Sequence, residues 1–400
     1  MNHNVYFKRW IGLLFLMVLS AFSTFASFYK IPEGNKSRAL VLFFFSLVAL
    51  LKVLNKKHWE RILYDLKHSV LFKFFVFTSI LSFFHILIEG RSVSVNSLDF
   101  FFPCFLLIYV IFMSNAKNIN KIITLVLGFW LVVGIPELFL NLLMDGAKFC
   151  GQYCSIYYAN RPGAAATIQT FFLTNFISLE SLGLSSQEFS IVLGLILVKL
   201  FCKLRSKISL RNLLLLLLLL LIQVFSISAS VLFAEIIAAV YVFKERKVHF
   251  DFMRFFWGFS FAILLIYLLK FGIVKDFNRY LDLIIYAPYK YFLEMSWYEK
   301  LFGVTDSGSL PMNNRYFILL GRFGILWGLC FVWGMFKLIN QIKKRQQSSR
   351  ALELKSCLLF LSLCNVHNNL WSTISGSILL SLIIINLYHY FYGPLKYGHV

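Results

Sequence analysis

Three arginines belong to the two longest segments between the apolar runs of this chain. Arg161 lies within residues 144–187, Arg279 lies within residues 273–314, and Arg315 directly follows that second segment. A guanidinium group stays charged and offers a planar pair of donors, which suits the oxygens of a phosphate. These arginines therefore indicate a site for a phosphorylated substrate, with solvated or headgroup-bound arginines as the alternative.

Two further charged groups accompany these arginines. Glu188, in the sequence Gln-Glu-Phe-Ser, opens an apolar run. It can either pair with an arginine or act as a base, or it can simply stabilise a helix N-terminus. Arg322 follows Arg315 by two helical turns, and we expect it to point into the same cavity as the loop arginines.

Familiar catalytic and metal-binding motifs are missing from the sequence. There is no P-loop, no GxGxxG after a strand, no HExxH and no GxSxG. Cys364 and His367 share a helix face, but two ligands do not make a metal site. We therefore interpret Cys364 and His367 as a polar packing patch.

The composition is that of a membrane protein. Of the 400 residues, 59% are hydrophobic and 14% are charged, whereas a soluble domain is about one quarter charged. A bilayer core about 30 Å thick needs about 20 apolar residues per helix, and its backbone groups must be satisfied internally. The sequence predicts an all-α polytopic integral membrane protein, and we interpret its 46 phenylalanines as lipid-facing bulk.

Apolar runs predict about 11–12 transmembrane helices in a single membrane domain, residues 1–400. Two of the split regions, 212–243 and 356–391, must each cross the membrane and return. The second of these has a polar middle that should face protein or water rather than lipid. The predicted spans are 10–28, 38–54, 70–88, 98–113, 119–143, 188–204, 212–226, 227–243, 255–272, 315–337, 356–373 and 375–391.

The cations set the predicted orientation. A net charge of +21 in a soluble protein would suggest nucleic acid, but here the cations concentrate in short loops between spans. The most basic loops, 55–69, 203–211, 244–254 and 337–355, all fall on one side. By the positive-inside rule both termini are cytoplasmic. Segments 144–187 and 273–314 then become two large loops on the far side, and the aromatic residues of the second predict amphipathic helices at the membrane face.

Several of these features together resemble the Wzy-type O-antigen polymerases, within the O-antigen polymerase/ligase superfamily. The layout of about a dozen helices with two large outer loops is similar. Leu301-Phe302-Gly303, Asn313-Asn314-Arg315-Tyr316 and the run from Arg322 to Gly328 resemble the family's motif at the end of the second loop. Gln187-Glu188-Phe189-Ser190 and Phe225-Ser226-Ile227-Ser228 resemble two further family segments, although the arginine that often follows the second is missing here.

The resemblance implies a GT-C-like fold and a glycosyltransferase of the bacterial inner membrane that needs neither a metal nor a cofactor. Such enzymes join undecaprenyl-pyrophosphate-linked O-antigen repeat units in the periplasm during lipopolysaccharide synthesis, often with a polysaccharide co-polymerase that regulates chain length. On this reading Arg161, Arg279 and Arg315 bind pyrophosphate and Glu188 orients an arginine or the acceptor. Asn314, Tyr316 and Arg322 contact substrate, with Asn314 orienting the sugar.

Three other classes of membrane protein remain open. An O-antigen ligase is disfavoured because no histidine accompanies Asn313 and Asn314. A lipid-linked oligosaccharide flippase typically has short loops and internal repeats, neither of which the sequence shows. A secondary transporter with broken midplane helices is compatible with the split segments, but it does not explain the two long outer loops.

Overall fold

A computed structural model describes residues 34–88, 97–112, 116–144, 178–179, 184–206, 208–225, 229–243, 285–304, 315–344, 349–364 and 374–392. These residues form helices, with one minimal pair of antiparallel strands. The helices are α2 (Gly34–Val53), α3 (Lys56–His68), α4 (Val70–Ile88), α5 (Ser97–Phe112), α6 (Ala116–Met144), α10 (Ser186–Ser206), α11 (Leu210–Phe225), α12 (Ala229–Phe243), α15 (Ala287–Glu294), α16 (Trp297–Phe302), α17 (Arg315–Lys344), α18 (Ser349–Cys364) and α19 (Ile374–Tyr392), and the strands are β1 (Ser178–Leu179) and β2 (Leu184–Ser185).

Two helices in the described residues are long and apolar enough to cross a bilayer. Their candidate spans are Ile119–Pro136 in α6 and Tyr316–Gly334 in α17, and the bent pair α2–α3 makes a third if it counts as one span. Apolar helices of 10–17 residues account for the other candidates in the described part of the chain. Large apolar side chains such as Phe43, Leu50 and Phe83 are more than half exposed. These features indicate an α-helical membrane protein.

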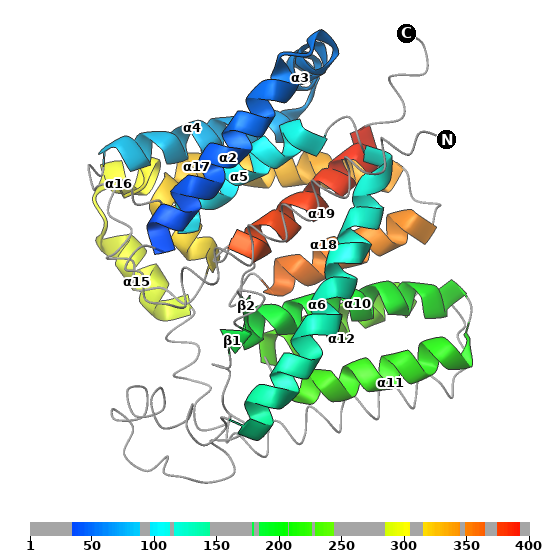
Figure 1. Cartoon of the computed structure of the whole chain (residues 1–400). Coiled ribbons are helices and arrows are strands. Elements are labelled where there is room, and N and C mark those ends of the chain that lie inside the picture. The colour runs from blue at the N-terminus through cyan, green and yellow to red at the C-terminus, as the bar shows by residue number, and fades with distance from the viewer. Residues whose placement is uncertain are drawn as a thin grey trace.

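The helices pack in two groups (Figure 1). One group is built on α5, which contacts α2, α4 and α19, while α17 packs on α4. The other is built on α10, which contacts α11, α12 and α18. Helix α6 runs across both groups and packs against α19 and α10. The short helices α15 and α16 lie at one end of the first group and pack against α17.

Phenylalanine fills much of the interior of the first group. Phe75 of α4 stacks on Phe105 of α5 with ring centroids 3.8 Å apart, and both are buried. Trp327 of α17 packs on Phe74 and donates its indole N–H to Thr78 Oγ1 at 2.9 Å. Our interpretation of phenylalanine as lipid-facing bulk was therefore incomplete, because aromatic pairs also join the helices to one another.

Most predicted spans that fall on described residues coincide with helices. The predicted spans 10–28 and 255–272 lie outside the described residues. Helix α18 begins seven residues before its predicted span 356–373, because the apolar pattern continues back to buried Ala351 and Leu354. The predicted basic loop 55–69 contains helix α3, whose apolar residues recur at helical spacing.

Helix α17 departs from the sequence prediction at Gly324. The predicted span 315–337 contains Gly321, Gly324 and Gly328, and a continuous helix would place these glycines on one face. Gly324 instead has φ 80° and ψ 173°, so the helix is broken there. That conformation favours glycine, because a Cβ would clash with the backbone in the left-handed region.

The two predicted outer loops are described in part. The first, 144–187, contributes the last residue of α6, the β1–β2 pair and the start of α10. The second, 273–314, contains α15 and α16, which confirms that it carries short helices. Their exposed aromatic residues are Tyr286, Tyr289, Trp297, Tyr298 and Phe302.

Candidate functional site

The end of α16 crosses the broken part of α17 at two glycines. A Cβ on Gly303 would collide with the carbonyl oxygen of Arg322, and a Cβ on Gly324 would collide with the carbonyl oxygen of Leu301. Both glycines have positive φ, and the Val304 N–H donates to Gly321 O at 2.8 Å. The structure thus brings together two glycine-containing stretches whose glycines, Gly303 and Gly324, are 21 positions apart in the sequence.

Arg322 fixes this crossing from inside. Its side chain is fully buried and donates from Nε to Asp99 Oδ1 at 3.3 Å and from Nη2 to Asp99 Oδ2 at 2.7 Å. Its Nη1 donates to the carbonyl oxygen of Val304 at 3.1 Å. The charge of Arg322 is therefore balanced by Asp99 on α5, and one guanidinium joins α5, the end of α16 and α17.

His85 of α4 completes the buried cluster. Its Nδ1 lies 3.8 Å from Asp99 Oδ1 and has no hydrogen-bond partner, and its ring stacks on Phe323 at a centroid distance of 5.6 Å. Four segments of the chain therefore meet at one ion pair.

A second buried polar cluster joins α10, α11 and α12. Gln223 Nε2 donates to Glu235 Oε1 at 2.8 Å, to Ser190 Oγ at 2.9 Å and to the Ser190 carbonyl oxygen at 3.3 Å. Glu235 is 3% exposed, and its Oε2 has no hydrogen-bond partner. Gly194 makes room for this cluster, because a Cβ there would lie 2.6 Å from Glu235 Oε1.

Glu235 and Asp99 were not among the site residues predicted from the sequence. Glu235 is the one carboxylate of the apolar predicted span 227–243, and an acid within a membrane helix is a signal in itself. Asp99 lies in the first turn of α5, where the helix dipole alone would explain it. Its pairing with Arg322 crosses 223 residues and has no local signature.

The structure describes the predicted site residues unevenly. Arg161, Arg279 and Asn314 lie outside the described residues. Glu188 stands in the first turn of α10 and Arg315 is the first residue of α17, but the side chains of both are outside the described part. A meeting of the three arginines with Glu188 therefore stays a prediction.

Tyr316 and Arg322, the other predicted substrate contacts, have structural partners. The Tyr316 hydroxyl donates to the carbonyl oxygen of Ser362 at 2.8 Å, which ties α17 to the last turn of α18. Arg322 is fully buried against Asp99 and Val304. Arg315 precedes Arg322 by seven residues in α17, so the two backbone positions are about two helical turns, or about 10 Å, apart.

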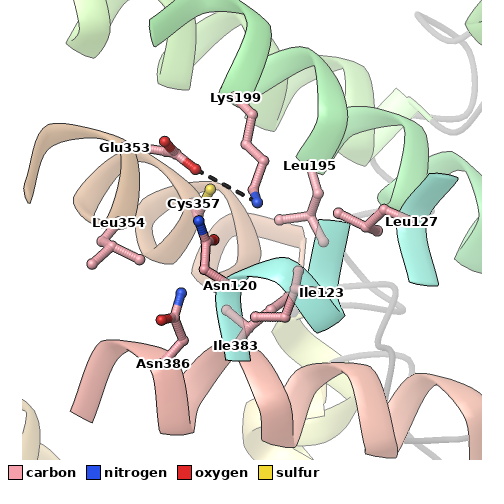
Figure 2. Close-up of a pocket in the computed structure, with 10 residues that line it drawn as sticks. All are labelled: Asn120, Ile123, Leu127, Leu195, Lys199, Glu353, Leu354, Cys357, Ile383 and Asn386. Atoms are coloured by element: carbon pink, nitrogen blue, oxygen red, sulfur yellow. Dashed lines mark ion pairs between the residues drawn. The ribbon is translucent and has the colours of Figure 1, made fainter. Parts of the chain in front are cut away.

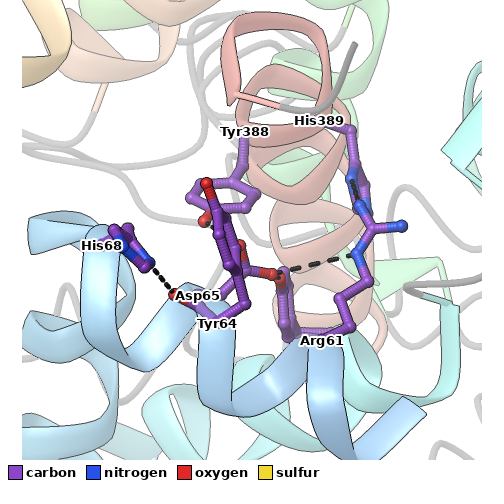
Figure 3. A network of polar contacts seen from close by, with 7 residues as sticks. Arg61, Tyr64, Asp65, His68, Tyr388 and His389 are labelled. Atoms are coloured by element: carbon purple, nitrogen blue, oxygen red, sulfur yellow. Dashed lines mark hydrogen bonds and ion pairs between the residues drawn. The ribbon is translucent and has the colours of Figure 1, made fainter. Parts of the chain in front are cut away.

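A different polar network lies where α3 meets the ends of α5 and α19 (Figure 3). Asp65 accepts hydrogen bonds from the hydroxyl groups of Tyr109 and Tyr388, the latter at 3.1 Å. Arg61 Nη2 lies 3.2 Å from His389 Nδ1. In the predicted topology all of these residues belong to cytoplasmic helix ends, whereas those around Arg322 belong to the opposite ends. The contacts in these two clusters therefore agree with the predicted topology, in which successive helices cross the membrane in opposite directions.

A small cavity lies between α6, α10, α18 and α19 (Figure 2). Lys199 Nζ is 3.5 Å from Glu353 Oε1 at its rim, and Asn120 and Asn386 face the same space. The cavity holds about 20 Å³, enough for one water molecule. It is too small for a sugar, and its residues belong to the predicted cytoplasmic side.

Comparison with known proteins adds no relative. No family model, curated protein or solved structure matches this chain. Among the described residues, no group of three or more His, Cys, Asp or Glu side chains is arranged to hold a metal ion.

Proposed function

We propose that this chain is a multi-pass glycosyltransferase of the bacterial inner membrane, an O-antigen polymerase of the Wzy type with a GT-C-like arrangement. It joins undecaprenyl-pyrophosphate-linked repeat units on the periplasmic side, with both termini in the cytoplasm. The observation that carries the proposal is the crossing of Gly303 and Gly324, locked by Arg322 and Asp99. This crossing unites the stretches of sequence that resemble the family motif.

The crossing would hold the residues of the motif in fixed positions. Val304, the last described residue before 305–314, accepts a hydrogen bond from Arg322 of α17, and α17 begins directly after 314. Arg315 is the first residue of α17, a helix held by the Arg322–Asp99 pair, and Asn314 directly precedes it in the sequence. Binding groups that are already held in place lose less conformational entropy when they bind a substrate.

The proposed reaction uses the arginines as electrostatic stabilisers. The acceptor sugar hydroxyl attacks the anomeric carbon of the donor chain, the bond from that carbon to the pyrophosphate oxygen breaks, and undecaprenyl pyrophosphate leaves with the bonding electrons. Glu188 takes the hydroxyl proton or orients an arginine. Cations from Arg161, Arg279 and Arg315 stabilise the charge on the leaving group, and one such donor contributes about 3–4 kcal/mol in comparable sites.

A complementation assay tests the proposal. Deletion of a polymerase leaves a single repeat unit on the lipid A core, whereas deletion of a ligase leaves the core without O-antigen. We expect the wild-type gene to restore a ladder of chain lengths. Arg161→Ala, Arg279→Ala and Arg315→Ala should each collapse the ladder while protein levels stay constant. Full-length ladders from all three variants would contradict the proposed role of these arginines in binding pyrophosphate.

The proposed partner gives a second readout. A polysaccharide co-polymerase would set the modal chain length without forming the glycosidic bond. Its deletion should therefore broaden the ladder made by this chain rather than remove it. A ladder unchanged in both length and distribution would contradict the partnership.

A further inference from the structure

Helix α3 lies across the direction of α2. The helical segments Arg38–Val53 and His58–His68 are bent by 103° at a short break. If α2 crosses the bilayer, α3 therefore runs nearly parallel to the membrane surface. Helices with separate apolar and charged faces adopt this orientation at membrane interfaces.

One face of α3 is fastened to the protein. Asp65 is buried and accepts hydrogen bonds from the hydroxyl groups of Tyr109 and Tyr388, while Arg61 reaches His389 (Figure 3). These contacts come from α5 and α19. The position and the rotation of α3 are therefore fixed relative to α5 and α19.

The neighbouring face of α3 is apolar and exposed. Trp59, Leu63 and Leu66 recur at intervals of four and three residues, so they form one stripe. Their exposed fractions are 47%, 45% and 37%. An apolar stripe of this kind on a fixed helix needs an apolar environment, which the acyl region beside a membrane protein supplies.

The next face round the helix is charged. Lys56, Glu60 and Lys67 are exposed and fall on one stripe, beside the apolar stripe and away from Asp65. Protein, apolar and charged faces thus follow one another round α3. This order matches a helix at the edge of a protein whose one side enters lipid while the next side meets headgroups.

We propose that α3 is an interfacial helix that binds anionic phospholipids of the adjoining leaflet. Trp59, Leu63 and Leu66 enter the boundary between headgroups and acyl chains, and Lys56 and Lys67 bind the headgroup phosphates. The positive charges of Lys56 and Lys67 are complementary to the negative charges of the headgroup phosphates. The chain as a whole also carries a net charge of +21. An anionic membrane surface attracts each nearby lysine, with an enrichment of about fivefold per side chain.

A fluorescent amino acid in place of Leu63 or of Glu60 tests the orientation in the full-length protein in lipid nanodiscs. The two positions form a matched pair, because both are exposed on the same helix and differ only in face. We expect lipids brominated on the acyl chain to quench the probe at position 63 and a water-soluble quencher to reach the probe at position 60. Equal quenching at both positions would overturn the proposal. A probe at position 63 that neither quencher reaches would also overturn it, because a protein partner would then cover the stripe.

Headgroup preference tests the lysines with the probe at position 63. At equal mole fraction, brominated phosphatidylglycerol should quench that probe more strongly than brominated phosphatidylcholine. The combined Lys56→Gln and Lys67→Gln variant should remove most of this preference. The matched variant Lys121→Gln with Lys203→Gln makes the same charge change at exposed lysines of α6 and α10 and should keep it. No preference in the unmodified chain, or equal loss in both variants, would contradict headgroup binding by α3.

Discussion

Gly303 and Gly324 meet backbone to backbone, and neither position has room for a side chain. A Cβ on Gly303 would strike the carbonyl of Arg322, and a Cβ on Gly324 would strike the carbonyl of Leu301. Both residues also have positive φ. The second predicted loop is thereby joined to the broken helix α17 through main-chain contact that other residue types would force apart.

Replacement of either crossing glycine should destabilise the protein. Gly303→Ala and Gly324→Ala each combine an unfavourable φ with a backbone clash, so we expect a loss of about 1–3 kcal/mol each. Gly334→Ala is the matched control, because a Cβ there meets nothing within 4 Å and alanine favours the helix. Thermal unfolding in detergent measures the difference. Equal stability of Gly303→Ala and Gly334→Ala would show that the two segments do not cross.

The buried pair of Arg322 and Asp99 should be strongly coupled. Loss of one partner leaves the other charged and buried, so Arg322→Ala or Asp99→Ala should each cost about 3–5 kcal/mol. The double variant should cost clearly less than the sum of the two, because no lone charge remains. Unfolding free energies of the four proteins give the coupling. Simple additivity would mean that the two side chains do not interact.

Glu235 should act through hydrogen bonding rather than through charge. Its Oε1 accepts from Gln223, and a Glu235→Gln side chain keeps a carbonyl oxygen in that place. We expect Glu235→Gln to retain stability and chain-extending activity. Glu235→Ala should lose about 1–3 kcal/mol, because it removes an acceptor from a buried donor and leaves space. A ladder lost in the stable Glu235→Gln variant would instead assign the carboxylate a direct part in the reaction.

The start of α16 should loosen in acid. Ser296 caps the helix, and its hydroxyl and backbone N–H both donate to Glu299 Oε2, which lowers the pKa of Glu299 below its ordinary value. Because the folded state has the lower pKa, this stabilisation is complete above the ordinary value and is lost as the pH falls through the lowered one.

Hydrogen exchange of residues 297–302, corrected for its intrinsic pH dependence, measures this effect. Protection should begin to decline at about pH 4.5, the ordinary pKa of a glutamate, and should continue to fall at lower pH. Glu299→Gln keeps an oxygen for the cap but cannot titrate, so its protection should be independent of pH over this range. A wild-type profile as flat as that of Glu299→Gln would show that the cap does not form.

Long apolar runs predicted most of the described helices, because such runs have few alternatives to helix in a membrane. Predicted spans 38–54, 70–88 and 98–113 correspond to α2, α4 and α5 within a few residues. Helix α3 was missed because its charges made it look like a loop, although Trp59, Leu63 and Leu66 share one stripe. Charge counts alone cannot distinguish a basic loop from a basic interfacial helix.

The candidate site was only partly predictable. The stretches containing Gly303 and Gly324 could be selected as motifs, but their crossing depends on a chain reversal that has no local pattern. Arg322 looked like a ligand-binding arginine because its partner Asp99 is remote in sequence. Pairings across 223 residues arise from packing of whole helices, which residue types and spacing do not specify.

Reconstitution gives the most direct test of sugar transfer by this chain. The purified protein is incubated in lipid vesicles with undecaprenyl-pyrophosphate-linked repeat units, and both chain length and released undecaprenyl pyrophosphate are measured. We expect chains of increasing length, with one undecaprenyl pyrophosphate released for each new linkage, and a rate reduced at least a hundredfold in Arg315→Ala. Repeat units that remain single while the folded protein is present would contradict the proposed function.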